Sequence, residues 1–249
     1  MAIFISMKRN SLIILFSINL LFLTTLSAHK RTDYKKKVVD TINVGGDRYR
    51  VKWLLRENFE KGNWQNSWVL EATKADVEVK DGKLHLLDYG IGTTLWYKNE
   101  FPANIIIRYK TQTEEGMAEN KLNFNHISHA TETDGSILKI GKESKRTGAY
   151  TQYHQFPNYI ATLTYKHSRL RRDPGFELLS DSKEAAALDS IYEVVYSVYK
   201  GRIRYYLNGV KIHDVNDPKK ALPGGKFGLR TWSTKAWWDD IEIGVLEKL

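Results

Sequence analysis

Residues 192–212 read YEVVYSVYKGRIRYYLNGVKI and contain the clearest strand and turn signals in the chain. Valine, isoleucine and tyrosine dominate three short runs, and these residue types favour β-strands. Lys200-Gly201 separates the first run from the second, and Asn208-Gly209 separates the second from the third. Asn-Gly is the strongest short-range signal for a β-hairpin. This stretch therefore predicts three consecutive antiparallel strands.

The same pattern continues on both sides of this stretch. Short β-rich runs recur at intervals of about ten residues, and Asp81-Gly82 marks another hairpin. Only Lys183–Leu188 favours a helix, and no alternation of strands with long helices appears. All seven tryptophans lie before Tyr97 or after Arg230, so we expect the two ends of the chain to pack together, as in a jelly roll. The pattern predicts an all-β sandwich or barrel.

The composition limits the classes of function. The 249-residue chain contains no cysteine, which excludes disulfides, thiolate metal sites and cysteine nucleophiles. Its formal charge is +9, and the chain without Lys8 and Arg9 has a balance of +7. A positive balance favours an anionic partner, and an acidic polysaccharide meets this requirement as well as nucleic acid does.

The first residues have the pattern of a secretory leader. Met7–Arg9 is a basic start, Leu12–Leu23 is almost entirely apolar, and Thr25–Ser27 offers small residues for cleavage. The apolar run is shorter than the roughly 20 residues that a membrane span requires. We therefore expect residues 1–28 to be a signal peptide whose removal leaves no stable membrane anchor.

The rest of the chain is expected to have a simple organisation. Residues 29–45 begin polar and basic, and we expect a loose mature N-terminus there. Residues 46–249 contain no linker rich in glycine, serine or proline, which predicts one jelly-roll catalytic domain. The leader predicts an exported protein, periplasmic rather than fully secreted. An exported basic protein is not expected to bind nucleic acid.

Residues 123–176 concentrate the side chains that transfer protons and bind anions. They include four of the seven histidines, four tyrosines and a cluster of three arginines: His126, His129, His154, His167, Tyr150, Tyr153, Tyr159, Tyr165, Arg169, Arg171 and Arg172. Few structural requirements collect these residue types in one segment. We therefore look for the functional site here.

Two parts of the chain resemble a known family. Gly225–Trp232 and Trp238–Ile241 resemble the last two strands of concanavalin A-like jelly rolls that act on or bind carbohydrates, and Tyr205–Gly209 belongs to the same pattern. Residues Tyr153–Gln155 and Ser168–Phe176 resemble a family of small exported jelly-roll proteins from polysaccharide-degrading bacteria. That family includes an oligosaccharide dehydratase active on ulvan, the sulfated rhamnose–uronate polymer of green algae.

The resemblance implies a fold and an activity. The fold is an all-β, concanavalin A-like β-sandwich, or jelly roll. The activity is that of a carbon–oxygen lyase, a dehydratase that forms a 4,5-unsaturated uronic acid at the non-reducing end of acidic, ulvan-derived oligosaccharides. The implied partner is an anionic oligosaccharide that contains uronate and is in some cases sulfated.

Elimination across C4–C5 of a uronic acid requires three chemical groups. A cation must neutralise the carboxylate so that the C5 proton becomes acidic, a base must remove that proton, and an acid must protonate the group that leaves C4. Arginine suits the first role because its planar guanidinium binds a carboxylate through two hydrogen bonds. Histidine and tyrosine suit the proton transfers. Because guanidinium can stabilise the developing charge, we expect neither a metal nor another cofactor.

Alternation along strands sorts the candidates. If Gly148–Gln155 is a strand, Tyr150 and His154 share one face. With His126 they form the predicted catalytic set, in which the order of base and acid stays open. On the following strand, His167, Arg169 and Arg171 share a face, whereas Arg172 points the other way. The predicted substrate-binding residues are Arg169, Arg171, Arg172, Tyr159 and His167.

Other interpretations remain open. A non-catalytic carbohydrate-binding module would use Trp64, Trp68 and Tyr159 as stacking platforms. If a sugar rather than water leaves C4, the enzyme is a polysaccharide lyase. A glycosidase would require paired acidic residues alternating on one strand, and the chain has no such run. His126, His129 and Asp134 could hold a metal, but their spacing matches no strong motif.

The leader generates the first testable prediction. We expect the exported protein to begin between Ser27 and Lys30, because small residues follow the apolar run directly. Intact-mass measurement of the exported protein checks this. A mass that includes Leu12–Leu23 would contradict it.

Overall fold

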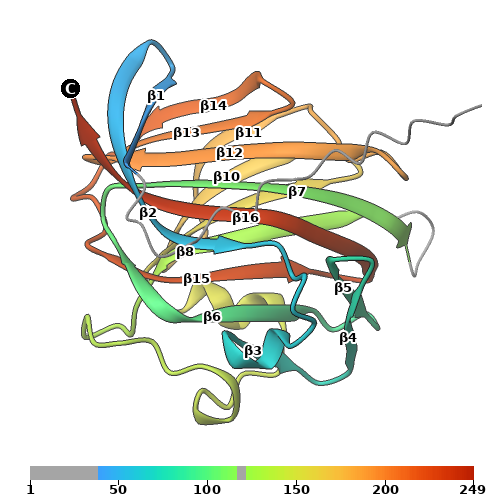
Figure 1. The fold of residues 1–249 in the computed structure, drawn as a ribbon. Coiled ribbons are helices and arrows are strands. Elements are labelled where there is room, and N and C mark those ends of the chain that lie inside the picture. Colours follow the sequence, from blue (N-terminus) through green and yellow to red (C-terminus); the bar gives the residue numbers. More distant parts are fainter. Residues whose placement is uncertain (1–38, 117–121) are drawn as a thin grey trace, which may run out of the picture. The chain divides into compact units, whose positions relative to one another are not determined.

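Two antiparallel β-sheets pack as a sandwich in the computed structural model, which describes residues 39–116 and 122–249 (Figure 1). Sheet A has the order β1-β2-β16-β7-β12-β13-β14, with β5 also beside β16 and β4 beside β5. Its strands are β1 (Val39–Val44), β2 (Asp47–Glu57), β4 (Ala75–Lys80), β5 (Lys83–Asp88), β7 (Ile105–Gly116), β12 (Ile191–Tyr199), β13 (Arg202–Leu207), β14 (Val210–Asn216) and β16 (Thr234–Lys248). The predicted signal peptide, residues 1–28, lies outside the described residues.

Sheet B lies against sheet A and has the order β11-β10-β9-β8-β15-β6-β3. Its strands are β3 (Trp68–Ala72), β6 (Thr93–Pro102), β8 (Asn123–Ala130), β9 (Asn158–Thr164), β10 (Ser168–Asp173), β11 (Glu177–Ser182) and β15 (Gly224–Thr231). The described helices are short 3-10 turns: η1 (Trp64–Asn66), η2 (Gly141–Glu143) and η3 (Tyr150–His154). The predicted all-β, concanavalin A-like jelly roll is confirmed.

The predicted hairpins form where the turn residues indicated them. β4 pairs with β5 across Asp81-Gly82, and β13 pairs with β14 across Asn208-Gly209. Both residues of each turn have positive φ, 51° and 70° in the first and 49° and 77° in the second. This geometry matches the right-handed twist of the flanking strands, and glycine adopts it without steric cost.

The two ends of the chain meet in sheet A, as the distribution of tryptophans predicted. β2 pairs with β16 from Glu57–Ile241 to Tyr49–Lys248. The expectation of a loose terminus up to residue 45 is wrong over Val39–Val44, which forms β1 and pairs with β2. Backbone pairing with an ordered neighbour holds this segment, although its composition is polar.

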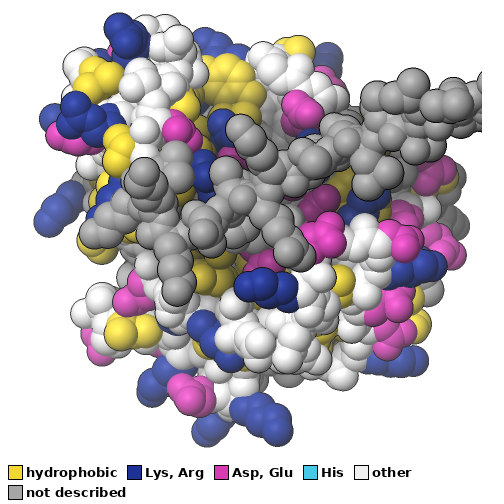
Figure 2. All heavy atoms as spheres, viewed as in Figure 1, with side chains coloured by type: hydrophobic (Ala, Val, Ile, Leu, Met, Phe, Trp, Pro, Cys, Tyr) yellow, Lys and Arg dark blue, Asp and Glu magenta, His cyan; other side chains and the backbone are white. Residues whose placement is uncertain are grey.

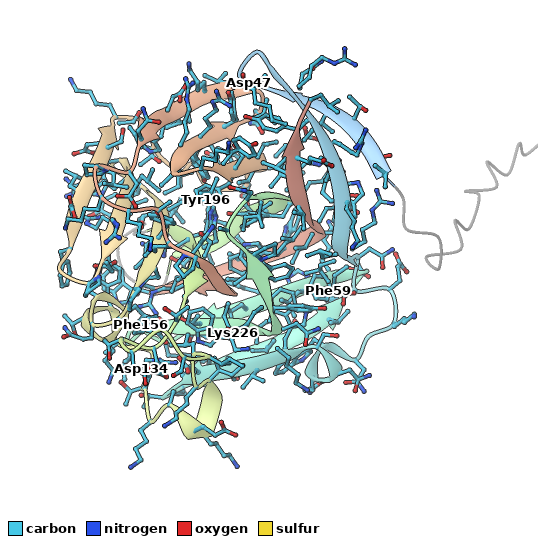
Figure 3. All side chains as sticks on the ribbon, turned by 90° about the vertical axis from the view of Figure 1, so that its left-hand side faces the viewer. Asp47, Phe59, Asp134, Phe156, Tyr196 and Lys226 are labelled. Atoms are coloured by element: carbon cyan, nitrogen blue, oxygen red, sulfur yellow. The ribbon has the colours of Figure 1, made fainter. Side chains whose placement is uncertain are left out.

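The main core fills the space between the two sheets. Alternate residues of each sheet B strand point into it, among them Leu95, Phe124, Leu163 and Leu229. Tyr196 lies between the sheets in Figure 3, and its hydroxyl accepts a hydrogen bond from Ser128. The residues between these alternate positions necessarily point to the opposite side, which is called the outer face of sheet B below.

Two local predictions are wrong. Gly148–Gln155, predicted as a strand, instead contains the 3-10 helix η3 over Tyr150–His154. Lys183–Leu188, where the composition favours a helix, has no regular secondary structure. Both segments connect strands of the sandwich, and their packing against it outweighs their weak local preferences.

On the face shown in Figure 2, lysine and arginine side chains are interspersed with aspartate and glutamate. The formal positive charge therefore forms no single patch on that face. Within residues 39–116 and 122–249, no helix has the length and apolarity needed to cross a membrane.

Three of the four buried histidines, His126, His129 and His213, have only neutral hydrogen-bond partners. Burial lowers the pKa of His126 to about 3, and it lowers the pKa of His129 and of His213 to about 4. Each ring is held by neutral partners: the hydroxyl of Tyr109 lies 2.9 Å from His126 Nδ1. These side chains are therefore uncharged in the folded protein near neutral pH.

The buried histidines predict a loss of stability in acid. The unfolded chain binds a proton at a pKa near 6.5, above the folded values, so unfolding takes up protons as the pH falls below that value. The free energy of unfolding should fall when the pH is lowered from 7 to 5. We expect this fall to be about 2 kcal/mol smaller in His126→Gln than in the wild type. Urea unfolding at the two pH values measures this difference. Equal losses in the two proteins would contradict a neutral His126.

Candidate functional site

A row of polar side chains crosses the outer face of sheet B. Each member is the direct register partner of the next on neighbouring strands β3, β6, β15, β8, β9 and β10: Glu71, Thr94, Arg230, Asn125, Thr162 and Arg169. All except Arg169 are buried. This polar row exists because period-two alternation places apolar neighbours, such as Leu95 and Leu229, in the core.

The segment between β8 and β9, residues 131–157, packs on this face and is called the covering segment. It is drawn in yellow-green at the lower left of Figure 1, and Figure 3 labels two of its residues, Asp134 and Phe156. Tyr153 and Phe156 form a second hydrophobic cluster with Trp96, Ile127 and other residues. The covering segment therefore brings its own side chains onto the outer face of sheet B.

Glu71 fixes the covering segment to the sheet. The guanidinium of Arg146 donates two hydrogen bonds to its carboxylate, at 3.0 and 2.9 Å. The backbone N–H of Gly141 and the hydroxyl of Tyr153 donate two more, each at 3.0 Å. Glu71 is only 2% exposed, so these contacts lie where water screens them weakly. Burial also raises the pKa of Tyr153, which keeps that hydroxyl a donor.

Tyr150 and His154 meet at the end of this segment. Their ring centroids lie 4.3 Å apart with the planes nearly perpendicular. His154 Nδ1 lies 2.8 Å from Asp173 Oδ1, an oxygen that also accepts the N–H of Phe176 at 2.8 Å. Because a carboxylate accepts hydrogen bonds, Nδ1 is the donor in this contact. His154 Nε2 has no hydrogen-bond partner among the described residues.

Tyr150 lies in a partly buried, positively charged environment. Burial raises the pKa of its hydroxyl, and the positive charges of Arg171 and Arg230 oppose that rise. Phe176 stacks on His154 with ring centroids 3.4 Å apart and lies 6.1 Å from the Tyr150 ring. The cluster thus combines a protonated hydroxyl, an imidazole whose Nε2 has no partner among the described residues, and two nearby cations.

The three arginines of β10 have different surroundings. Arg171 forms no hydrogen bond or ion pair with any described residue. Arg169 pairs with Asp181 at 3.3 Å at the exposed sheet edge. Arg172 is on the inward side of the strand, where its Nε donates to Asp217 at 2.8 Å. Arg172 therefore stabilises the fold and does not lie with the predicted site.

Two further candidates point away from the outer face. His126 is fully buried between the sheets against Tyr109 and Tyr196. Tyr159 is fully buried as well, and its hydroxyl donates to Asp217 at 2.5 Å. The predictions of a catalytic His126 and a substrate-binding Tyr159 are therefore wrong, because the even positions of β8 and the odd positions of β9 face the core.

The remaining predictions concern His167, the tryptophans and the metal. His167 lies on the outer side of sheet B at the turn between β9 and β10, partly exposed, and burial lowers its pKa. Trp68 is 1% exposed, which removes it as a sugar platform, whereas Trp64 is partly exposed and packs against the edge of the core. Within the described part of the chain, no three histidine, aspartate or glutamate side chains form a cluster suited to a metal ion.

Sequence reasoning missed two residues of this region, Asp173 and Arg230. Asp173 precedes a proline, a pattern that indicates an ordinary turn residue. Its contact with His154 arises only because the covering segment folds back onto the sheet. Arg230 is fully buried, donates from Nη1 to Thr94 Oγ1 at 2.9 Å, and lies over the rings of Tyr153 and Tyr150 at 4.4 and 5.5 Å. The sequence did contain one signal for Arg230: it lies on the opposite face of the strand from the apolar residues Phe227 and Leu229.

The fold places the protein in a recognisable structural class, the jelly-roll sandwiches that include carbohydrate-binding modules and glycosidases. A galectin-like protein of unknown function from Bacillus subtilis has a TM-score of 0.68 at 23% identity, covering 81% of this chain and 100% of that one. The endo-β-1,3-glucanase of Pyrococcus furiosus has a TM-score of 0.57 at 11% identity, covering 85% and 100%. The carbohydrate-binding module CBM66 from Bacillus subtilis has a TM-score of 0.52 at 11% identity, covering 70% and 93%.

The sequence identifies the family within that class. Residues 87–241 match the family described as Domain of unknown function (DUF6250), and the protein belongs to this family. No curated protein matches the chain. At the identities above, the structural relatives establish the fold alone.

The anchoring role of Glu71 generates a prediction. We expect Glu71→Ala to lower the free energy of unfolding by about 3–5 kcal/mol, because it leaves the buried end of Arg146 and the Tyr153 hydroxyl without their acceptor. Hydrogen exchange should accelerate in residues 141–154 more than in the sheets. Chemical denaturation and exchange mass spectrometry measure the two effects.

A matched control is Glu177→Ala, which removes a carboxylate from the exposed pair with Lys219. An exposed pair contributes about 1 kcal/mol or less, so this variant should remain close to the wild type. If both variants lose the same stability, Glu71 does not anchor the covering segment.

Proposed function

We propose that the protein is a carbon–oxygen lyase of the dehydratase type that acts on acidic oligosaccharides. It would form a 4,5-unsaturated uronic acid at the non-reducing end and release water. The observation that supports this most directly is the contact of Tyr150 with His154, whose Nδ1 is held by Asp173 and whose Nε2 is buried without a partner among the described residues. Such an arrangement supplies one proton acceptor and one proton donor at neighbouring positions.

His154 is the proposed base. Asp173 accepts a hydrogen bond from Nδ1–H, which orients the imidazole and stabilises the positive charge that develops when Nε2 takes a proton. A base at Nε2 would remove the C5 proton of the uronate, and the electron pair of that C–H bond would move into the carboxylate. The resulting enolate-like charge needs nearby cations, which are the strongest contributors in reactions of this kind.

Tyr150 is the proposed acid. Burial raises its pKa, so the hydroxyl is protonated at neutral pH and able to donate. Its proton would pass to the C4 hydroxyl as the C4–O bond breaks, so that water leaves and the C4=C5 double bond forms. The proton held by His154 then returns to Tyr150 directly or through water. Atoms balance: one substrate gives one unsaturated product and one water.

The anionic character of the substrate is part of the proposal. Arg171 is an unpaired cation near Tyr150, and the carbohydrate relationship of the fold favours a glycan over other anions. The sequence resemblance makes ulvan-derived oligosaccharides the first substrates to test. We also propose export to the periplasm, on the basis of the apolar leader that precedes the sandwich.

The proposed chemistry predicts the behaviour of two variants. We expect His154→Ala and Tyr150→Phe each to lower the rate of unsaturated uronate formation by about 100- to 10,000-fold, the usual contribution of a positioned acid or base. Oligosaccharide binding should survive in both. Ultraviolet absorbance of the conjugated product measures turnover, and calorimetry measures binding.

Matched controls are His85→Ala and Tyr199→Phe, which change the same residue types on sheet A. Both should turn over at the wild-type rate. Wild-type rates in His154→Ala and Tyr150→Phe would contradict the assigned roles. Binding of acidic oligosaccharides without any absorbing product in the wild type would favour a non-catalytic binding module. A sugar released with the unsaturated product would identify a polysaccharide lyase.

A further inference from the structure

We propose that Arg230 is the receptor for the substrate carboxylate, so that the reacting anion binds within the polar row and not at the β10 arginines predicted from the sequence. The inference depends on the proposed function only in identifying the anion as a sugar carboxylate. It assigns a binding role to a residue on β15, far from the 123–176 segment in sequence.

Arg230 is a buried cation that forms no direct ion pair, and the charges of two buried carboxylates, Asp88 and Glu71, act on it from a longer distance. It is fully buried, yet no carboxylate of the described residues lies within ion-pair distance of its guanidinium. Nη1 donates to Thr94, whereas Nε and Nη2 have no partner in the described part of the protein. A buried charge is costly unless it is paired. A guanidinium with two free donors is suited to a planar carboxylate, which it binds through two hydrogen bonds.

Arg230 lies between two polar side chains that could contact the rest of a sugar. Asn125, its register partner on β8, has an unpartnered Oδ1, an acceptor for a sugar hydroxyl. On the other side, the guanidinium lies 5.5 Å from the ring centroid of Tyr150, the proposed acid. A carboxylate on Arg230 would therefore bring the adjoining C4 and C5 of a uronate close to Tyr150 and His154.

The backbone above the guanidinium is closely packed. A Cβ on Gly92 would lie 2.4 Å from Arg230 Nη2 and 2.4 Å from the carbonyl oxygen of Gly148. A Cβ on Gly148 would lie 1.9 Å from the Gly92 oxygen. Both residues have positive φ, 115° and 93°, so glycine is required twice where the two loops meet. The two loops therefore meet directly over the guanidinium of Arg230.

Arg204 provides the matched comparison on sheet A. It is also buried, at 2% exposure, but Asp47 lies 2.6 Å from its Nη2 and Asp214 lies 3.6 Å from its Nε. Asp47 is at the opposite end of the view in Figure 3 from Phe156 and the covering segment. Arg204 thus has carboxylates in direct ion pairs, whereas Arg230 has none among the described residues.

The binding experiment compares two probes on the same proteins. One is a glucuronate-terminated oligosaccharide prepared from ulvan, and the other is that oligosaccharide after reduction of its carboxylate to an alcohol. Calorimetry is performed in a His154→Ala background, which prevents turnover. We expect the Arg230-containing protein to prefer the carboxylate probe by at least about 10-fold, as a charge-assisted pair of hydrogen bonds provides.

Arg230→Met should abolish this preference, and Arg230→Lys should retain only part of it because lysine lacks the planar fork. Arg204→Met should keep the full preference. The inference is overturned if Arg230→Met still prefers the carboxylate probe to the same degree, or if the parent protein shows no preference.

The outcomes also separate this inference from the proposed function. If the wild type forms no unsaturated product but loses carboxylate preference with Arg230→Met, the dehydratase proposal fails and the receptor stands. If the wild type forms the product while Arg230→Met keeps the preference, the dehydratase proposal stands and the receptor fails.

Discussion

The site depends on one buried carboxylate, that of Glu71. A covering segment with little regular structure brings Tyr150 and His154 to the outer face of sheet B, and such a segment has no backbone ladder to hold it. Glu71 supplies the missing constraint by accepting hydrogen bonds from Arg146, Gly141 and Tyr153. Because the carboxylate is buried, movement of the segment would break the four hydrogen bonds that it accepts there.

The polar row shows how a sandwich accommodates polar chemistry on a sheet. Antiparallel register places one residue from each of six strands side by side, and period-two alternation keeps the same strands apolar toward the core. At one end of the row Glu71 is satisfied within the protein, whereas Arg230 near the middle is not. Buried polar groups are normally paired, so an unpaired one points to a ligand more strongly than an exposed cluster of charges does.

Much of the fold could be predicted because its signals are local. Asp81-Gly82 and Asn208-Gly209 determine their turns through backbone conformations that few other residue pairs adopt, and short β-branched and aromatic runs flank them. The failures lie where local preference is weak. Gly148–Gln155 lacks the alternation of a buried strand, and its 3-10 helix follows from packing against Trp96 and Ile127.

The sequence by itself determined the fold class, the hairpins, the meeting of the chain ends and the segment in which functional side chains are concentrated. Each depends on residue type and on neighbours close in the chain. Only the tertiary structure decided which of those side chains lie together. A strand's alternation does not say which of its faces meets the other sheet, and for this reason His126 and Tyr159 were assigned to the wrong side. Arg230 joins Tyr150 and His154 through strand pairing between distant parts of the chain, a relation that no local pattern contains.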